Sequence, residues 1–239
     1  MRATAPIPGA GGPGFQSISI MQPDELAELL RRAIREGILS PGQALVQEDL
    51  AKRFKVSRIP VREALRMLVA DGLAIARPGR GLSVMKLDAS DVAELYDLRL
   101  TIEPALSPYI IANASQADLQ RWRTLIREMD GQPLPLHEWV RANYRFHLAL
   151  YEVTGRPHTL RLIQSLFNLT MPYSRLYMQT AQAQESADRE HETMLDLIDR
   201  RDSAALAELI ALHLSTAREA LVAYLGTQQS DDGLALLQE

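Results

Sequence analysis

The chain has 239 residues, enough for one large domain or two modest ones, and its content of 46% hydrophobic and 23% charged residues is typical of a globular protein. It contains no cysteine, which excludes disulfides and thiolate metal sites, and no apolar run approaches the roughly 18–20 residues that a membrane-spanning helix needs. The net charge of −4 is uneven, because residues 22–86 carry 12 Lys and Arg against 8 Asp and Glu, whereas residues 87–239 carry 13 against 22.

A basic segment joined to an acidic one indicates a polyanionic partner for the basic segment, although a drift of surface charge would give the same numbers. With no cysteine and no membrane span, we expect a cytoplasmic protein without a membrane partner. The first residues, MRATAPIPGAGGPGFQSISI, are rich in Gly and Pro and lack a continuous apolar core. They predict a disordered arm over residues 1–21 rather than a signal peptide.

Three helices are expected in the basic segment. The first begins at Pro23 and has an apolar stripe on one face, the second is the short stretch QEDLAKRF, and the third begins near Pro60 and ends at Gly72. A short helix, a tight turn and a further helix form a helix-turn-helix pattern, in which the last helix enters the major groove of DNA.

The third helix carries arginines at four-residue spacing, namely Arg58, Arg62 and Arg66. Arginine can bind guanine with a bidentate fork or clamp a phosphate, so these side chains are candidates for contact with DNA. The alternative is a set of surface salt bridges, for instance with Glu63 or Asp49.

Two short strands are expected in LAIARPGRGLSVMKL, residues 73–87, with RPGRG as the tip of the hairpin. Gly79 and Gly81 permit a tight turn around Arg80. A hairpin that follows a helix-turn-helix is a wing, and its basic tip suits the minor groove or the phosphate backbone.

The stretch GILSPGQALVQEDLAKRFKVSRIPVREALRMLVADGLAIARPGRGLSV resembles the winged helix-turn-helix of GntR-family transcription regulators, most specifically in VSRIPVREAL. The resemblance implies that double-stranded operator DNA is contacted by Ser57, Arg58, Arg62, Gly79 and Arg80. Three positions depart from the family pattern. Lys55 replaces a turn Gly and is strained if the turn needs a positive φ. Ile59 replaces a Thr, which leaves Ser57 as the candidate helix cap, and Glu48 stands where the family often has Arg.

The acidic segment is expected to be helical throughout. Six helices are predicted, at 90–113, 115–130, 135–154, 157–179, 184–201 and 203–225. The segment contains no βαβ alternation, no Gly-rich phosphate loop and no Gly-x-Ser-x-Gly motif, so an antiparallel helical bundle is the expected architecture.

Three of the five histidines lie on three different predicted helices, namely His147, His191 and His213, and Asn143 precedes His147 by one turn. Imidazoles from neighbouring helices can converge on one ion inside a bundle, and neutral imidazole suits Zn²⁺ or Ni²⁺. The alternative for each histidine is an ordinary position in the core or on the surface.

The segments LYDLRLTIEPALSPYIIANAS, NYRFHLALYEVTGRPHTLRLI and HETMLDLIDRRDSAALAELIALHL resemble the FCD effector domain of the FadR subgroup, in its six-helix, VanR-like branch. The resemblance implies a divalent metal bound by Asn143, His147, His191 and His213, and a small carboxylate effector bound by Arg99. Asn143 stands where the family has Asp, which should weaken the metal site. The alternative for Arg99 is an ion pair with Glu103, one turn away.

We therefore predict a mainly α protein, with a winged helix-turn-helix domain at 22–86, an all-α six-helix antiparallel effector domain at 87–226 and a flexible tail at 227–239. The expected function is that of a homodimeric transcription regulator whose operator affinity depends on a small organic acid. A metal-dependent hydrolase with a three-His site is one alternative, although the chain has no His-Glu-x-x-His motif. An effector-blind DNA-binding protein is the other.

Overall fold

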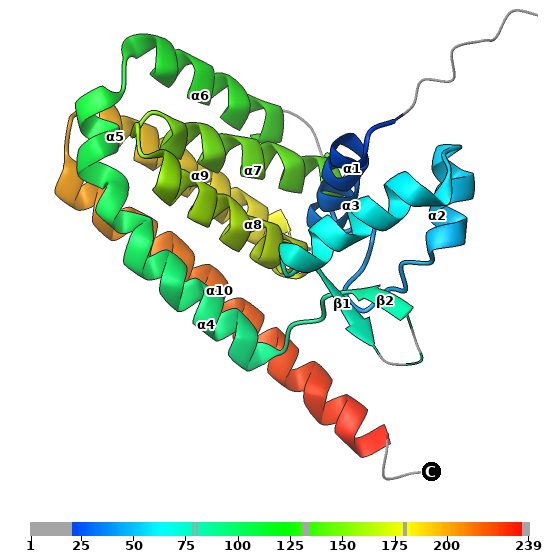
Figure 1. Cartoon of the computed structure of the whole chain (residues 1–239). Coiled ribbons are helices and arrows are strands. Elements are labelled where there is room, and N and C mark those ends of the chain that lie inside the picture. Colours follow the sequence, from blue (N-terminus) through cyan, green and yellow to red (C-terminus); the bar gives the residue numbers. More distant parts are fainter. Residues whose placement is uncertain (1–20, 78, 80, 131–133, 179–180, 236–239) are drawn as a thin grey trace, which may run out of the picture.

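The computed structural model describes residues 21–235 except 78, 80, 131–133 and 179–180 (Figure 1). The arm predicted for residues 1–21 lies outside the described residues apart from Met21. Two hydrophobic clusters fill the molecule, one formed mainly by residues up to Val84 and the other by residues from Met85 onward. Within the described part of the chain, no helix is both long and apolar enough to cross a membrane.

The smaller unit is a winged helix-turn-helix, as expected. Its elements are α1 (Pro23–Arg35), α2 (Gln47–Phe54), α3 (Arg58–Ala70), β1 (Ala74–Arg77) and β2 (Gly81–Val84). The two strands pair in antiparallel register, with Ala74 opposite Val84, and an isolated bridge from Ala44 to Ser83 adds a third segment to this small sheet. The apolar stripe of α1 packs against the inner face of α3, where Val61, Ala64 and Leu68 are fully buried.

The turn between α2 and α3 has the strain that the sequence predicted. Lys55 caps α2 in the left-handed conformation, with φ 55° and ψ 41°. Helix α3 begins at Arg58, two residues before the expected start, so Pro60 falls within the first turn rather than at its beginning. Proline is tolerated there because the first four backbone N–H groups of a helix have no intrahelical acceptor.

The larger unit is an antiparallel helical bundle. Its elements are α4 (Ala89–Ile102), the 3-10 turn η1 (Pro104–Leu106), α5 (Ser107–Asn113), α6 (Gln116–Asp130), α7 (Leu136–Glu152), α8 (Pro157–Tyr177), α9 (Ala181–Asp199) and α10 (Ser203–Ala235). Helices α4 and α10 lie side by side along one flank of the bundle, and α7 and α8 face the winged unit (Figure 1). Trp122, Trp139, Phe146 and Phe167 fill its centre.

Most helix boundaries lie within three residues of the prediction, and two helices differ from it more strongly. The helix expected at 90–113 is interrupted by η1, because Pro104 has no N–H for the next helical hydrogen bond. If α4, η1 and α5 are counted as one interrupted helix, the bundle has the expected six. Helix α10 continues to Ala235, past residue 226, where the tail was predicted to begin; the segment 203–235 contains no proline, and helix extension is favourable once a helix is formed.

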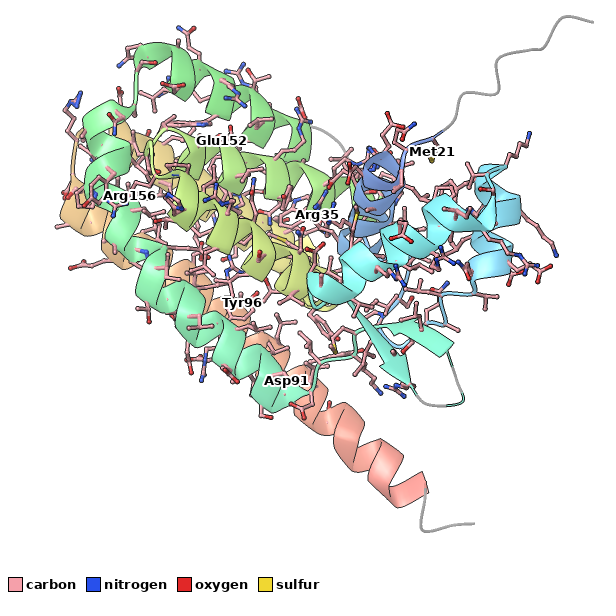
Figure 2. All side chains as sticks on the ribbon, in the orientation of Figure 1. Met21, Arg35, Asp91, Tyr96, Glu152 and Arg156 are labelled. Atoms are coloured by element: carbon pink, nitrogen blue, oxygen red, sulfur yellow. The ribbon has the colours of Figure 1, made fainter. Side chains whose placement is uncertain are left out.

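The C-terminal end of α1 connects the two units. The Arg35 guanidinium lies 3.9 Å from the ring centre of Tyr144 on α7, and its Nη1 donates to Asn168 Oδ1 on α8 at 2.8 Å. Figure 2 shows Arg35 between α1 and the bundle. The buried Glu36 carboxylate accepts a 2.7 Å hydrogen bond from Arg141 on α7. Helices α7 and α8 therefore hold α1 directly.

Candidate nucleic-acid interface and candidate metal centre

Helix α3 presents its first turns to solvent. The Arg58 side chain is 68% exposed and the Arg62 side chain 55% exposed. Each also has an acidic neighbour, because Arg58 lies 3.2 Å from Glu48 and Arg62 lies 3.4 Å from Glu63. Surface salt bridges, weighed as the alternative, are thus present: the expected one with Glu63 forms, whereas Arg58 pairs with Glu48. Exposed pairs of this kind contribute only about 0–1 kcal/mol, so a DNA phosphate can replace the carboxylate.

The other predicted DNA contacts surround this helix. Ser57 is the N-cap residue of α3, with extended backbone, but its hydroxyl makes no capping hydrogen bond, so the expected capping role is not seen. Gly79, with φ +72°, and Gly81, with φ +77°, form the wing turn in a conformation that favours glycine. Arg80 lies outside the described residues and stays a prediction.

The three histidines meet inside the bundle. His147 from α7, His191 from α9 and His213 from α10 have ring centres 4.9–5.2 Å apart, and one nitrogen from each lies within 4.8 Å of the others. His147 and His191 are buried and His213 is nearly so. The convergence predicted from three scattered sequence positions is present in the structure.

Several polar atoms of this cluster are buried without a hydrogen-bond partner among the described residues. They are Nδ1 of His147, both ring nitrogens of His191 and Oδ1 of Asn143. The Asn143 amide nitrogen points toward the Met171 sulfur at 4.0 Å, which leaves its oxygen as the unused group. Buried polar atoms normally have partners, and leaving one unpaired costs about 1–3 kcal/mol. The arrangement therefore suits a bound cation that accepts these lone pairs.

The charge state of the cluster also suits a cation. Burial lowers the pKa of His147 and His191 well below its usual value, and the neighbouring imidazoles lower it further. Both rings are therefore neutral at physiological pH and can offer a lone pair. Asn143, His147 and His213 line a small cavity of about 20 Å³, which holds a single ion or water and is too small for an organic acid. The residues present fit Zn²⁺ or Ni²⁺.

Arg99 lines the same cavity but pairs with Glu103. Its Nε donates to the Glu103 carboxylate at 2.6 Å, both side chains are buried, and the Tyr151 hydroxyl donates to Glu103 at 2.7 Å. Burial by itself lowers the pKa of Arg99, but the negative charge of Glu103 raises it above its usual value. The ion pair weighed as an alternative is present, and Arg99 remains a fixed cation beside the histidines.

Arg99 still has donors to offer. A guanidinium has five N–H groups, and the hydrogen bonds of Arg99 to described residues use three of them, two toward Glu103 and one toward Thr170. Each terminal nitrogen therefore retains one N–H, and these two groups are available to a further acceptor such as a carboxylate. Tyr96 and Phe167 hold the guanidinium between their rings.

Sequence reasoning missed three members of this site. Tyr151 and Thr170 complete the surroundings of Arg99 from α7 and α8, and Glu190 hydrogen-bonds to His213. Tyr151 lies four residues, or one helical turn, after His147, so its position on the same helix face could have been predicted from the sequence. Glu190 and His213 are 23 residues apart on different helices, and no local pattern connects them.

Two family models match the chain: "Bacterial regulatory proteins, gntR family" over residues 22–84 and "FCD domain" over residues 94–216. The uncharacterized HTH-type transcriptional regulator YdhC of Bacillus subtilis (strain 168) is 28% identical over 193 residues, which cover 78% of this chain and 84% of that protein. The HTH-type transcriptional repressor GlaR of Escherichia coli (strain K12) is 26% identical over 197 residues, which cover 78% of this chain and 90% of that protein.

Solved structures show the same fold. E. coli McbR/YncC matches with a TM-score of 0.73 and 22% identity, over 87% of this chain and 98% of that one. A putative transcriptional regulator GntR from Rhodococcus sp. RHA1 matches with a TM-score of 0.75 and 23% identity, over 84% of this chain and 97% of that one.

Proposed function

The chain belongs to the GntR family of bacterial regulatory proteins and carries an FCD domain, and we propose that a small carboxylate, held beside a divalent metal in that domain, controls its affinity for operator DNA. The family makes the chain a DNA-binding transcription regulator and not the metal-dependent hydrolase weighed above. The proposal rests on one observation. The buried ring nitrogens and the Asn143 oxygen, which have no hydrogen-bond partner among the described residues, lie beside the two remaining N–H groups of Arg99.

We propose that α3 enters the major groove, with Arg58 and Arg62 reaching bases or phosphates, Ser57 and Gly79 contacting the backbone, and Arg80 extending the wing. A homodimer would present two such helices to paired half-sites about one DNA turn apart. The exposure of both arginines supports this assignment. Glu48 adds an acidic group to the same surface, where it pairs with Arg58 and Lys52.

Arg62→Ala should weaken binding to operator DNA by about 1–3 kcal/mol, because an arginine–base or arginine–phosphate contact is lost. Glu48→Gln should act in the opposite direction, because it removes a negative charge that holds Arg58 away from phosphate. A gel-shift titration on DNA selected from a random-sequence pool measures both. Arg200→Ala is the matched control, since Arg200 is exposed at the end of α9 in the other unit. Unchanged binding by Arg62→Ala would remove Arg62 from the interface.

In the helical domain, His147, His191 and His213 with Asn143 would hold the metal, which when bound supplies a Lewis-acidic centre for a carboxylate oxygen. Arg99 would orient the other end of the carboxylate through its two remaining N–H groups. The buried position of Arg99 excludes water and strengthens this contact. Asn143 contributes an oxygen without a charge, so the metal is bound less tightly than it would be by a carboxylate.

The small size of the cavity connects binding to movement. A volume of about 20 Å³ cannot contain an organic acid, so side chains that close it, such as Met171 and Met178, must shift when the acid enters. Met171 lies on α8, three residues from Asn168, which holds Arg35 of α1. Asn143 lies on α7 beside Tyr144, which stacks on the same Arg35. A ligand that prefers a shifted α7 or α8 therefore also repositions the DNA-binding unit.

Adding Zn²⁺ or Ni²⁺ together with the right small carboxylate should raise the melting temperature of chelator-stripped protein. A ligand at 100 times its dissociation constant stabilises the native state by about 2.7 kcal/mol. The screen pairs each acid with its uncharged amide, which cannot bind the Arg99 fork as an anion. If no carboxylate changes either the melting temperature or the DNA affinity, the protein is effector-blind and the proposal is wrong.

A further inference from the structure

Glu190 on α9 reaches across to α10 and hydrogen-bonds to His213. Its Oε2 is 2.5 Å from Nδ1 of His213, and both side chains are mostly buried at the edge of the histidine cluster. The other nearby carboxylate, Asp188, lies 4.0 Å from His191 Nδ1, which is beyond hydrogen-bond distance. Glu190 therefore provides a direct carboxylate hydrogen bond to an imidazole of the cluster, whereas Asp188 stands as a more distant ion-pair neighbour of His191.

This contact decides which nitrogen of His213 is available to a ligand. A carboxylate only accepts hydrogen bonds, so Nδ1 carries the proton, and in the neutral ring that binds a metal Nε2 carries the lone pair. His147 and His191 have no such partner on their unpaired nitrogens. A carboxylate that holds the second nitrogen of a metal-binding histidine fixes the ring's tautomer and orientation and raises its basicity.

The charge of the proposed ligand set also favours a role for Glu190. An imidazole that binds a metal through its lone pair is neutral, so three imidazoles and an amide bring no negative charge to a divalent cation, and Arg99 in the same cavity carries a positive charge that Glu103 balances. Glu103 is already committed to Arg99 and Tyr151. Glu190 brings a carboxylate to the cluster, because it is hydrogen-bonded directly to the proposed metal ligand His213.

We propose that Glu190 is a positioning residue of the metal site, which keeps His213 in the tautomer that offers Nε2 and supplies the negative charge that the four ligands lack. This inference rests on the proposed metal site. It concerns a residue that does not itself touch the metal, so it goes beyond the ligand set. It also explains how an asparagine is tolerated at position 143.

Glu190→Gln should lower the affinity for Zn²⁺ by about 10–100-fold, the usual effect of removing such a partner. Glutamine can still accept the hydrogen bond from His213 through its carbonyl oxygen, so the variant isolates the charge. Glu190→Ala removes charge and hydrogen bond together and should weaken Zn²⁺ at least as much. Glu192→Gln is the matched control, because Glu192 is exposed two residues along the same helix. Competition titrations of Zn²⁺ against a chromophoric chelator, on full-length protein, give the affinities.

Two further measurements separate positioning from a merely structural role. The melting temperature of metal-free Glu190→Gln should match wild type, and ¹⁵N spectra should show His213 protonated on Nδ1 in wild type but not uniformly so in Glu190→Ala. If wild type binds Zn²⁺ and Glu190→Gln binds it equally well, the proposed role of the Glu190 charge is wrong. If Glu190→Ala also binds Zn²⁺ equally well, the whole inference is wrong while the metal site stands. If wild type binds no Zn²⁺ or Ni²⁺, the metal site itself is wrong and the inference falls with it.

Discussion

His191→Ala should lose bound metal almost completely, with an affinity for Zn²⁺ or Ni²⁺ lowered by more than about 100-fold, since changes outside the ligand set already cost about 10–100-fold. His191 is fully buried, and neither of its ring nitrogens has a partner among the described residues. Its ring centre lies 4.9 Å from that of His147 and 5.2 Å from that of His213. Its removal therefore leaves two of the three imidazoles. Elemental analysis of purified protein measures the metal content per chain.

His158→Ala is the control for this experiment. His158 is an exposed histidine at the start of α8 that contacts Arg161 and lies outside the cluster. His191→Gln keeps a polar side chain of similar length, and it should lose metal while the melting temperature of its metal-free form stays close to wild type. Equal metal content in wild type and both His191 variants would show that the cluster is an ordinary set of buried histidines.

Helical spacing predicted only the pairs within one helix, Asn143 with His147 and Arg99 with Glu103. The winged unit was predictable from a nearly continuous motif, in which each turn residue has a local physical role, such as Lys55 in its left-handed cap. The histidine cluster was predictable only through a family pattern, because nothing in the separation of His147, His191 and His213 along the chain shows that their helices pack together. Their convergence is confirmed, whereas metal binding is still a prediction.

The interactions that sequence reasoning could not decide are those between helices. Four-residue spacing offered Glu103 as an alternative partner of Arg99, but the Tyr151 and Thr170 contacts depend on how α7 and α8 pack against α4. The contact of Arg35 with Tyr144 joins residues more than 100 positions apart and fixes one unit against the other. The break at Pro104 was locally predictable, because proline has no N–H for the next helical hydrogen bond, yet one continuous helix was predicted across it at 90–113.

Glu103→Ala should be among the most destabilising single substitutions in the helical domain, at about 3–5 kcal/mol, because it leaves the Arg99 charge buried without its partner. Arg99 and Glu103 are 3% and 1% exposed, so water cannot replace the carboxylate. The Tyr151 hydroxyl loses its acceptor in the same variant. Urea unfolding followed by circular dichroism gives the change in the free energy of unfolding.

The double variant Arg99→Met with Glu103→Leu separates stability from ligand recognition. Replacing a buried ion pair with apolar residues of similar volume is often neutral or stabilising, by about 1–4 kcal/mol. The double variant should therefore unfold at or above the wild-type urea concentration. It should also bind Zn²⁺ through the three histidines and fail to respond to any carboxylate, because the guanidinium fork is gone.

A carboxylate effector should stabilise Glu103→Ala more than it stabilises wild type. In wild type the acid finds Arg99 already neutralised by Glu103, so it gains only the two remaining N–H groups. In Glu103→Ala it meets an uncompensated buried cation, and an added anion restores much of the lost interaction, since charge-assisted hydrogen bonds are about twice as strong as neutral ones. Melting curves of both proteins over a range of acid concentrations measure the difference. Equal shifts would mean that the acid does not bind at Arg99, and the effector site would then have to lie elsewhere in the bundle.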